Sequence, residues 1–296
     1  MEDKALPSRS QPERAESVGE IDLTVADRTI APGEAYLRDT PLLRPHAGTQ
    51  PDLFLRWNTV PLAASKLDVV VFLHGFSQQG GEMPLAEKVG RSGLDLSGRT
   101  RPTLALLPRG NWLRHYYYDF PALLEGGLDQ FVGYGLERFA AASPGRRGLM
   151  PDRLILAAHS GGGMPAVDAL AGARRPPDEL HIFDGLYGRD PRNDEPLRGV
   201  ETIDRWLADR LALEPARAGA LRVVYFERQT GEFTRAVGQR IATRIAARLP
   251  GLDPPLAAVL ARRYKIEVSG VVHARIADRC LPELLARADA EFDWLS

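Results

Sequence analysis

The chain has 296 residues, enough for one large α/β domain or two small ones. A net charge of -1 gives no reason to expect nucleic acid or an anionic membrane as a partner, and 44% hydrophobic residues suffice for a sizeable core. The single cysteine, Cys280, excludes an intrachain disulfide, and no apolar run is long enough for a membrane-spanning helix. Residues 1–10 lack the apolar core of a signal peptide, so we expect a soluble protein with the cytoplasm favoured, while export stays open.

The amino-terminal part of the chain has little regular pattern. Residues 1–20 are polar and charged without periodicity, which predicts a disordered leader. Residues 21–52 carry scattered prolines and are expected to form an irregular arm on the main domain. Residues 53–296 are expected to form a single domain, with room for a small cap within 185–220.

From residue 53 onward, short apolar runs alternate with longer amphipathic segments. Strands are predicted at 68–73, 103–107, 154–158, 180–183, 221–226 and 264–268. Helical periodicity is present at 127–142, 164–171, 201–213, 234–248 and 281–294. This alternation predicts an α/β fold: a doubly wound, mostly parallel sheet with helices on both faces.

Ser160 lies at a sharp transition from strand to helix. The strand 154–158 runs into His159-Ser160-Gly161-Gly162-Gly163, and a helical segment follows. A serine between a strand and a helix is typical of a nucleophile elbow, whose usual pattern is Gly-x-Ser-x-Gly. Ala158 takes the place of the first glycine, so the match departs by one methyl group.

Two other readings of the same segment stay open. Gly161 to Ala166 also matches Gly-x-Gly-x-x-Ala after a strand, and Asp184 ends the next strand, which is the outline of a dinucleotide site. That fingerprint normally follows the first strand of its sheet, whereas several strands precede this one. The three glycines would also suit a tight turn without any chemistry.

A serine nucleophile needs a base and an acid behind it. Among the six histidines, His273 follows the last predicted strand, where the fold with a nucleophile elbow places its base. Asp184 ends the strand after the elbow and is followed by Gly185, so it is the preferred acid. Glu227 and Glu232 follow the later strand and are the alternatives, although Arg228 offers Glu227 an ordinary ion pair.

The oxyanion formed during acyl transfer needs two amide donors. His74-Gly75 follows the strand 68–73, where this fold supplies one donor from a loop. We expect the two donors to be the backbone amides of Phe76 and Gly161.

With these residues assembled, the sequence resembles the α/β-hydrolase superfamily of serine esterases and lipases over residues 53–296. The resemblance is carried by His74-Gly75, by His159-Ser160-Gly161-Gly162 and by His273. It implies Ser160 as nucleophile, His273 as base and a backbone oxyanion hole, but it implies no substrate. The segment Phe-Asp-Gly-Leu-Tyr-Gly at 183–188 also looks similar to one in poorly characterised bacterial members, which favours Asp184.

An aromatic cluster is expected near the nucleophile. Trp112, Tyr116 and Tyr117 follow the strand 103–107, and Tyr187 follows Asp184. These side chains would line an acyl or aromatic substrate site, or else pack the following helix. We expect no metal, because no metal-ligand spacing is present, and no cofactor, because the proposed chemistry needs none.

The sequence therefore predicts a serine hydrolase acting on a small-molecule or acyl ester, with an amidase or peptidase as the alternative on the same residues. A dinucleotide-binding oxidoreductase and a catalytically silent binding protein are the alternatives from other classes. The sequence says nothing about oligomeric state.

Overall fold

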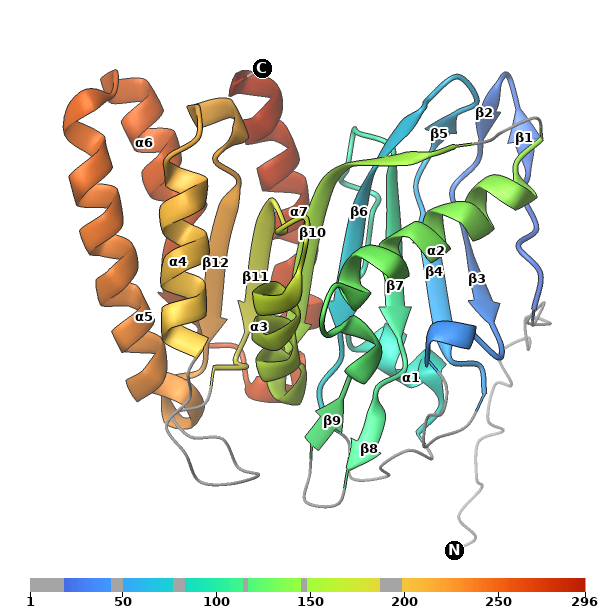
Figure 1. Ribbon diagram of the computed structural model, residues 1–296, viewed down its shortest axis with the longest axis horizontal. Helices are drawn as coiled ribbons and strands as arrows, with labels where there is room; N and C mark the ends of the chain where they lie inside the picture. Colours follow the sequence, from blue (N-terminus) through green and yellow to red (C-terminus); the bar gives the residue numbers. More distant parts are fainter. Residues whose placement is uncertain are drawn as a thin grey trace, which may run out of the picture.

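The computed structural model describes residues 19–43, 50–76, 83–113, 117–144, 148–186 and 199–295. In this part of the chain, eight strands form one twisted sheet (Figure 1). Its spatial order is β13 (Tyr264–Val268), β12 (Ala220–Tyr225), β11 (Glu179–Phe183), β10 (Met150–His159), β6 (Lys66–Leu73), β7 (Thr103–Pro108), β4 (Leu53–Trp57) and β3 (Gly33–Leu37). The six strands from β13 to β7 are parallel to one another. β4 runs antiparallel to both β7 and β3.

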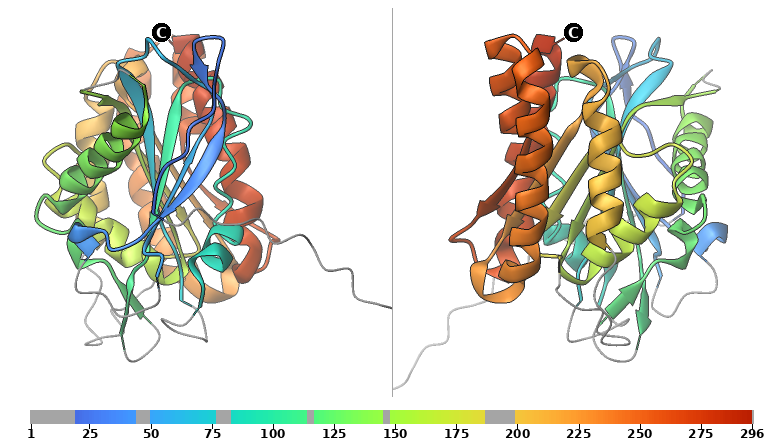
Figure 2. Two further views of the ribbon diagram at one scale, coloured as in Figure 1. Left: turned by 90° about the vertical axis from the view of Figure 1, so that its right-hand side faces the viewer. Right: turned by 60° about the vertical axis from the view of Figure 1, so that its left-hand side comes forward.

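Helices cover both faces of the sheet (Figure 2). One face packs against α2 (Gly127–Ala142), α3 (Gly163–Gly172), α4 (Gly199–Leu211) and α5 (Glu227–Arg248). The other face packs against α1 (Leu85–Gly90) and α7 (Ile276–Leu295), while α6 (Pro254–Arg263) connects α5 to β13. The predicted α/β-hydrolase-like arrangement of a mostly parallel, doubly wound sheet is confirmed.

The central strands follow from their sequence. Val69, Val70 and Val71 of β6 are fully buried because side chains alternate between the two helical layers, and both layers are apolar. The apolar run stops at His74-Gly75, and β6 ends at Leu73. Every predicted strand is present, although β10 begins four residues earlier than the sequence pattern predicted.

The segment 21–52 differs from expectation. It is not irregular throughout, because β3 pairs with β4 at the edge of the main sheet and buries Ala35 and Leu37. Prolines flank this strand without interrupting it, and an edge strand tolerates them. Two short strands, β1 (Val25–Ala26) and β2 (Thr29–Ile30), form a small separate sheet with β5 (Val60–Pro61).

The expected cap within 185–220 falls only partly on described residues. Residues 187–198 lie outside them, as does the leader up to residue 18. The described remainder contains α4, which packs between α3 and α5 in the main helical layer and contributes Trp206 and Leu207 to the core. Those residues therefore form part of the main helical layer.

Buried charges gather at the amino-terminal ends of the central strands. Arg99 donates to Asp68 at 2.6 Å, and Arg153 donates to Glu179 at 2.8 Å. His181 Nε2 also donates to Glu179, at 3.1 Å. Burial alone would raise the pKa of Glu179, but the hydrogen bond from His181 and the charge of Arg153 hold it well below its usual range.

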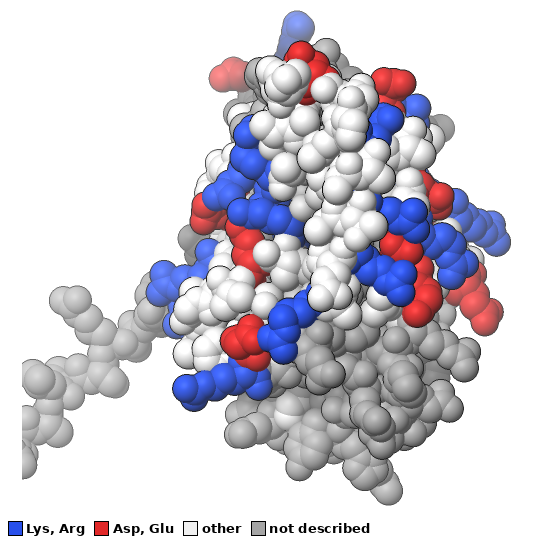
Figure 3. Space-filling view, turned by 90° about the vertical axis from the view of Figure 1, so that its left-hand side faces the viewer, with Lys and Arg blue, Asp and Glu red and all other residues white. Residues whose placement is uncertain are grey.

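Two surface features complete the description. On the side of the molecule where α5 and α6 lie, basic and acidic side chains stand side by side rather than in fields of one sign (Figure 3). Of the helices in the described ranges, none has the length and hydropathy needed to cross a membrane.

Candidate active site

Ser160 occupies a sharp turn between β10 and α3. Its φ of +51° lies in the left-handed region, which a serine adopts only where the surroundings enforce it. A side chain at Gly162 would collide with the carbonyl oxygen of Leu73, so this position needs glycine for the turn to approach β6. Ala158 is fully buried in the core, and its additional methyl group is therefore accommodated. The turn has the geometry predicted for a nucleophile elbow.

The structure brings Ser160, His273 and Asp184 into one chain of hydrogen bonds. The Ser160 hydroxyl lies 2.8 Å from His273 Nε2, and His273 Nδ1 lies 2.6 Å from Asp184 Oδ2. Nδ1 therefore carries the proton and donates to the carboxylate, which leaves Nε2 as the acceptor for the serine proton. Asp184 is fully buried, whereas the His273 side chain is 26% exposed.

Asp184 is held from several sides. Its other oxygen, Oδ1, accepts hydrogen bonds from the Phe226 amide at 3.2 Å and the Thr230 hydroxyl at 2.9 Å. Its φ of +45° is again left-handed, and this turn at the end of β11 aims the short side chain at His273. The carboxylate is thus fixed in position, and both of its oxygens have partners.

Of the two alternatives for the acid, only Glu227 has a described side chain. Glu227 lies in the first turn of α5, is exposed, and accepts from Arg235 rather than pairing with its neighbour Arg228. Glu232 belongs to the same helix, and its side chain lies outside the described part of the structure. Asp184, the preferred candidate for the acid, is therefore the carboxylate that the structure pairs with His273.

The loop after β6 lies directly against the elbow. A Cβ at Gly75 would lie 2.7 Å from Ser160 Cβ, so only glycine allows this approach. Phe76 comes next in this loop, and Gly161 belongs to the 3₁₀ turn that begins at Ser160. The two expected oxyanion donors thus belong to the two segments that meet at Ser160.

Two further histidines support the site. His159 Nε2 donates to the backbone oxygen of His273 at 2.8 Å, and burial lowers the pKa of His159 to about 4. His74 Nε2 accepts from the Gly110 amide at 3.0 Å, so its Nδ1 carries the proton and donates to the Gly75 oxygen. Burial also holds the pKa of His74 well below its usual value. Both rings are therefore neutral near pH 7. Their role is to hold backbone groups in position by hydrogen bonds and not to carry charge.

The structure also reveals a residue that the sequence analysis missed. Lys88 of α1 is buried, and its Nζ donates to the Gly75 oxygen at 2.7 Å. The helix that carries Lys88 has only six residues, too short to give a periodic signal. Its sequence neighbours, Glu87 and Val89, give no indication of this contact.

Of the four residues of the aromatic cluster, the structure describes the backbone of two, Trp112 and Tyr117. Trp112 lies on β8 (Asn111–Leu113) and Tyr117 on β9 (Tyr117–Asp119), and these strands form a hairpin that lies next to the turn Ser160–Gly162. Tyr116 and Tyr187 lie outside the described residues. The hairpin projects from the same edge of the sheet as the elbow (Figure 1).

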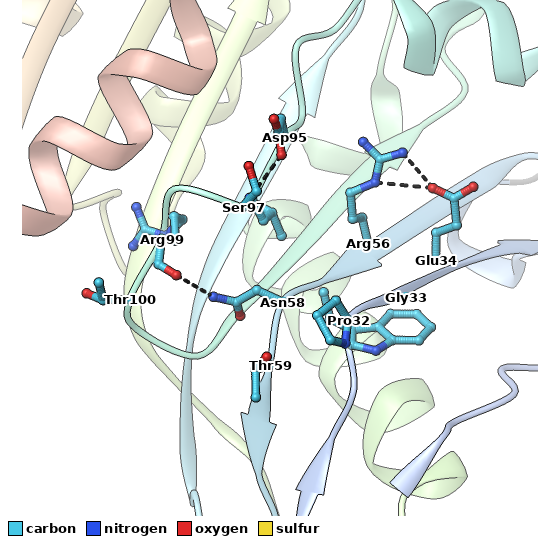
Figure 4. Close-up of a pocket in the computed structure, with 12 residues that line it drawn as sticks. Pro32, Gly33, Glu34, Arg56, Asn58, Thr59, Asp95, Ser97, Arg99 and Thr100 are labelled. Carbon is cyan, nitrogen blue, oxygen red and sulfur yellow. Dashed lines mark hydrogen bonds and ion pairs between the residues drawn. The ribbon is translucent and has the colours of Figure 1, made fainter. Parts of the chain in front are cut away.

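A depression of about 410 Å³ lies beside β3 and β4, and Ser160, His273 and Asp184 are not among the residues that line it (Figure 4). Its polar groups bond to one another: Arg56 donates to Glu34 at 3.2 Å, and Asn58 donates to the Arg99 oxygen at 3.1 Å. Within the described ranges, no group of three or more His, Cys, Asp or Glu side chains is arranged to hold a metal ion.

No protein-family model and no curated protein matches the sequence. Solved structures resemble it distantly. A ferulic acid esterase is 13% identical with a TM-score of 0.47, covering 90% of this chain and 99% of its own. An S-formylglutathione hydrolase from Agrobacterium tumefaciens is 12% identical with a TM-score of 0.44, covering 94% and 100%. Thermogutta terrifontis esterase 2 is 15% identical with a TM-score of 0.45, covering 87% and 99%. Similarities this distant say nothing about substrate or reaction, and the fold rests on the strand order itself.

Proposed function

We propose that this chain is a serine hydrolase that cleaves a carboxylic ester through an acyl-enzyme on Ser160. The observation that carries the proposal is the chain of hydrogen bonds from the Ser160 hydroxyl through His273 to Asp184, at 2.8 and 2.6 Å. A serine hydroxyl is a weak nucleophile until a base removes its proton, and this arrangement supplies both the base and its orienting carboxylate.

The reaction proceeds in two steps. Ser160 Oγ attacks the ester carbonyl while His273 Nε2 takes the hydroxyl proton, and the resulting oxyanion accepts from the amides of Phe76 and Gly161. His273 then gives that proton to the departing alcohol, which leaves the acyl group on Ser160. In the second step, water loses a proton to His273, attacks the acyl carbonyl and releases the carboxylic acid, with the proton returning to Ser160.

The next question is which residues would contact the substrate. The hairpin with Trp112 and Tyr117 lies beside the elbow and would supply an apolar or aromatic surface for the acyl group. An amide substrate would use the same residues. Activity on a series of p-nitrophenyl esters, compared with the matching p-nitroanilides, separates these two classes.

The dinucleotide alternative is weakened by two contacts. The glycine at 162 is required by the approach of the turn to β6, so no ligand is needed to explain it. Asp184, which would have to bind a ribose, has its oxygens bonded to His273, Phe226 and Thr230. A silent binding protein would retain the fold and lack a reactive serine.

A fluorophosphonate probe tests the proposal directly, because it reacts with an activated serine. We expect wild type to be labelled on Ser160, as located by mass spectrometry, and Ser160→Ala to be unlabelled and to lose turnover by on the order of 10⁶-fold. Ser97→Ala, at an exposed serine in the depression of Figure 4, is the matched control and should label like wild type. Folded wild type that resists the probe, or labelling that survives Ser160→Ala, would overturn the proposal.

A further inference from the structure

Lys88 is an unusual residue for its position. It is only 4% exposed, on a short helix whose neighbours Leu85 and Val89 belong to the core. Burying an ammonium group is costly unless strong partners replace the lost water. Its Nζ donates to the Gly75 carbonyl oxygen at 2.7 Å, and His74 Nδ1 donates to the same oxygen at 3.0 Å.

The geometry of the peptide group links the contact at the Gly75 oxygen to the direction of the Phe76 N–H. The Gly75 carbonyl and the Phe76 N–H belong to one planar peptide unit, in which a trans bond makes them point in opposite directions. Two donors that fix the oxygen therefore also fix the direction of the N–H. A positive charge on the oxygen side further polarises the peptide and strengthens its N–H as a donor.

Ser160 stands on the other side of this loop. The Gly75 backbone approaches Ser160 so closely that a Cβ there would lie 2.7 Å from the serine Cβ. Lys88 and His273 also face a shared small cavity of about 80 Å³, lined as well by His74, Phe76 and His159. Lys88 thus reaches the reactive centre through a single peptide unit.

We propose that Lys88 is a positioning residue that holds and polarises the Gly75–Phe76 peptide, so that the Phe76 N–H is aimed at the oxyanion. This inference rests on the proposed function, because it assigns Lys88 a part in transition-state stabilisation. In this proposal Lys88 acts through the peptide unit and not on the reacting atoms.

The surroundings make the charge on Lys88 depend on pH near neutrality. Burial, together with the charges of Arg91 and Arg109, lowers the pKa of Lys88 to about 7, although Glu87 acts in the opposite direction. The groups that face Lys88 come from α1 and its end, from the loops after β6 and β7, from the end of β10 and from the turn after β13: Glu87, Arg91, His74, Arg109, His159 and His273. The ammonium is therefore present below about pH 7 and is lost as pH rises through that value.

The first test compares Lys88→Met, Lys88→Gln and the matched control Lys66→Met, whose lysine is exposed at the far end of β6. Removing an oxyanion donor costs about 10²–10³-fold in turnover, and misaiming one should cost less. With p-nitrophenyl acetate, we expect Lys88→Met to lower kcat roughly 10- to 100-fold with KM nearly unchanged. Gln keeps a donor without charge and should recover part of the loss, while Lys66→Met should match wild type.

The second readout is the pH profile, which a merely structural lysine would not alter. Wild-type kcat should fall from about pH 7 upward as Lys88 loses its proton, and Lys88→Met should lack that fall. Because burial opposes the ammonium, Lys88→Met should unfold at a temperature no lower than wild type at pH 6. If Lys88→Met nevertheless fails to fold, Lys88→Gln carries the same kcat and pH comparison.

The outcomes separate the two proposals. Wild type that neither labels with fluorophosphonate nor hydrolyses the ester refutes the proposed function. An active, labelled wild type whose Lys88 variants keep wild-type kcat, or keep the same alkaline fall, refutes only the role of Lys88. A drop in kcat that Gln partly restores, with the alkaline fall removed by Met, supports it.

Discussion

The strand β11 carries a histidine–carboxylate pair at each of its two ends. At its amino end, Glu179 accepts from His181 at 3.1 Å, and after its carboxyl end Asp184 accepts from His273 at 2.6 Å. Both carboxylates are fully buried. A buried acid that orients an imidazole is therefore present twice in this molecule, and the pair alone does not mark a site.

What differs is everything around the pair. His181 is buried within β11, and the Arg153 guanidinium shares its carboxylate. His273 is partly exposed, lies in a loop, and has a serine hydroxyl 2.8 Å from its second nitrogen. Ser160 and Asp184 both have left-handed backbone. Three features thus distinguish the proposed active pair from the structural one: its histidine is accessible to solvent, a serine hydroxyl contacts that histidine, and the backbone of Ser160 and Asp184 is strained.

The largest contrast should come from removing each histidine. We expect His273→Ala to lower ester turnover by on the order of 10⁶-fold while the protein stays folded, because the serine loses its base. His181→Ala should keep turnover within a few-fold and lower the melting temperature instead. Ester hydrolysis and thermal unfolding of both variants check this, and a reversed pattern would show that the two ends have been assigned the wrong way round.

Substitutions of the two acids, Asp184 and Glu179, should differ in the same way, with a smaller loss of turnover than that from removing His273. Asp184→Asn should cost on the order of 10⁴-fold in turnover, because the amide orients the imidazole in the wrong tautomer. Steady-state kinetics at saturating ester checks this, with circular dichroism to establish folding. A loss of comparable size in Glu227→Gln would contradict the assignment.

Glu179→Gln should instead act on stability, and in a pH-dependent way. Breaking a buried ion pair costs about 3–5 kcal/mol. Since the pKa of Glu179 is lowered in the folded state, its stabilisation is present above its unfolded pKa of about 4.3 and is lost as pH falls below that value. Urea unfolding should thus show a wild-type advantage at pH 6 that shrinks toward pH 3, and an advantage independent of pH would refute this account.

Thr230→Val tests how firmly the acid must be held. It removes the hydroxyl that donates to Asp184 Oδ1 at 2.9 Å, while the Phe226 amide remains. A hydrogen bond to a charged group contributes about 1.5–3 kcal/mol, so we expect roughly a 10-fold loss in kcat. Thr243→Val, at an exposed threonine of the same helix, should leave kcat unchanged.

Ser160→Gly should show the smallest effect, and on stability alone. The left-handed backbone costs a serine about 1–2 kcal/mol, and glycine relieves it at an entropic cost of about 0.4–1 kcal/mol. We expect the inactive Ser160→Gly to be more stable than Ser160→Ala by up to about 1 kcal/mol in urea unfolding. The opposite order would mean that the turn stores no strain at this residue.

The sequence was sufficient to predict the central sheet and to single out Ser160, His273 and Asp184, which the structure brings together. The apolar run from Val69 to Leu73 predicts a buried parallel strand, because such strands are apolar on both faces. It was insufficient for β3, whose alternation is short and flanked by prolines, and for α1, which is too short for a period.

The acid and Lys88 depend on contacts between distant parts of the chain. Asp184 and Glu227 both follow strands, and the sequence preferred Asp184, but only the structure shows which carboxylate is paired with His273. Lys88 acts through a peptide unit in another loop, so its neighbours in the sequence carry no sign of its contact.

The Phe226 amide at the end of β12 lies 3.2 Å from Asp184 Oδ1, so two adjacent strand ends converge on one carboxylate. The orientation of the His273 imidazole therefore depends on where β12 ends as well as on β11, although Phe226 and Asp184 are 42 residues apart in the sequence. Ser160 depends in the same way on β6, because the carbonyl oxygen of Leu73 leaves room only for a glycine at position 162.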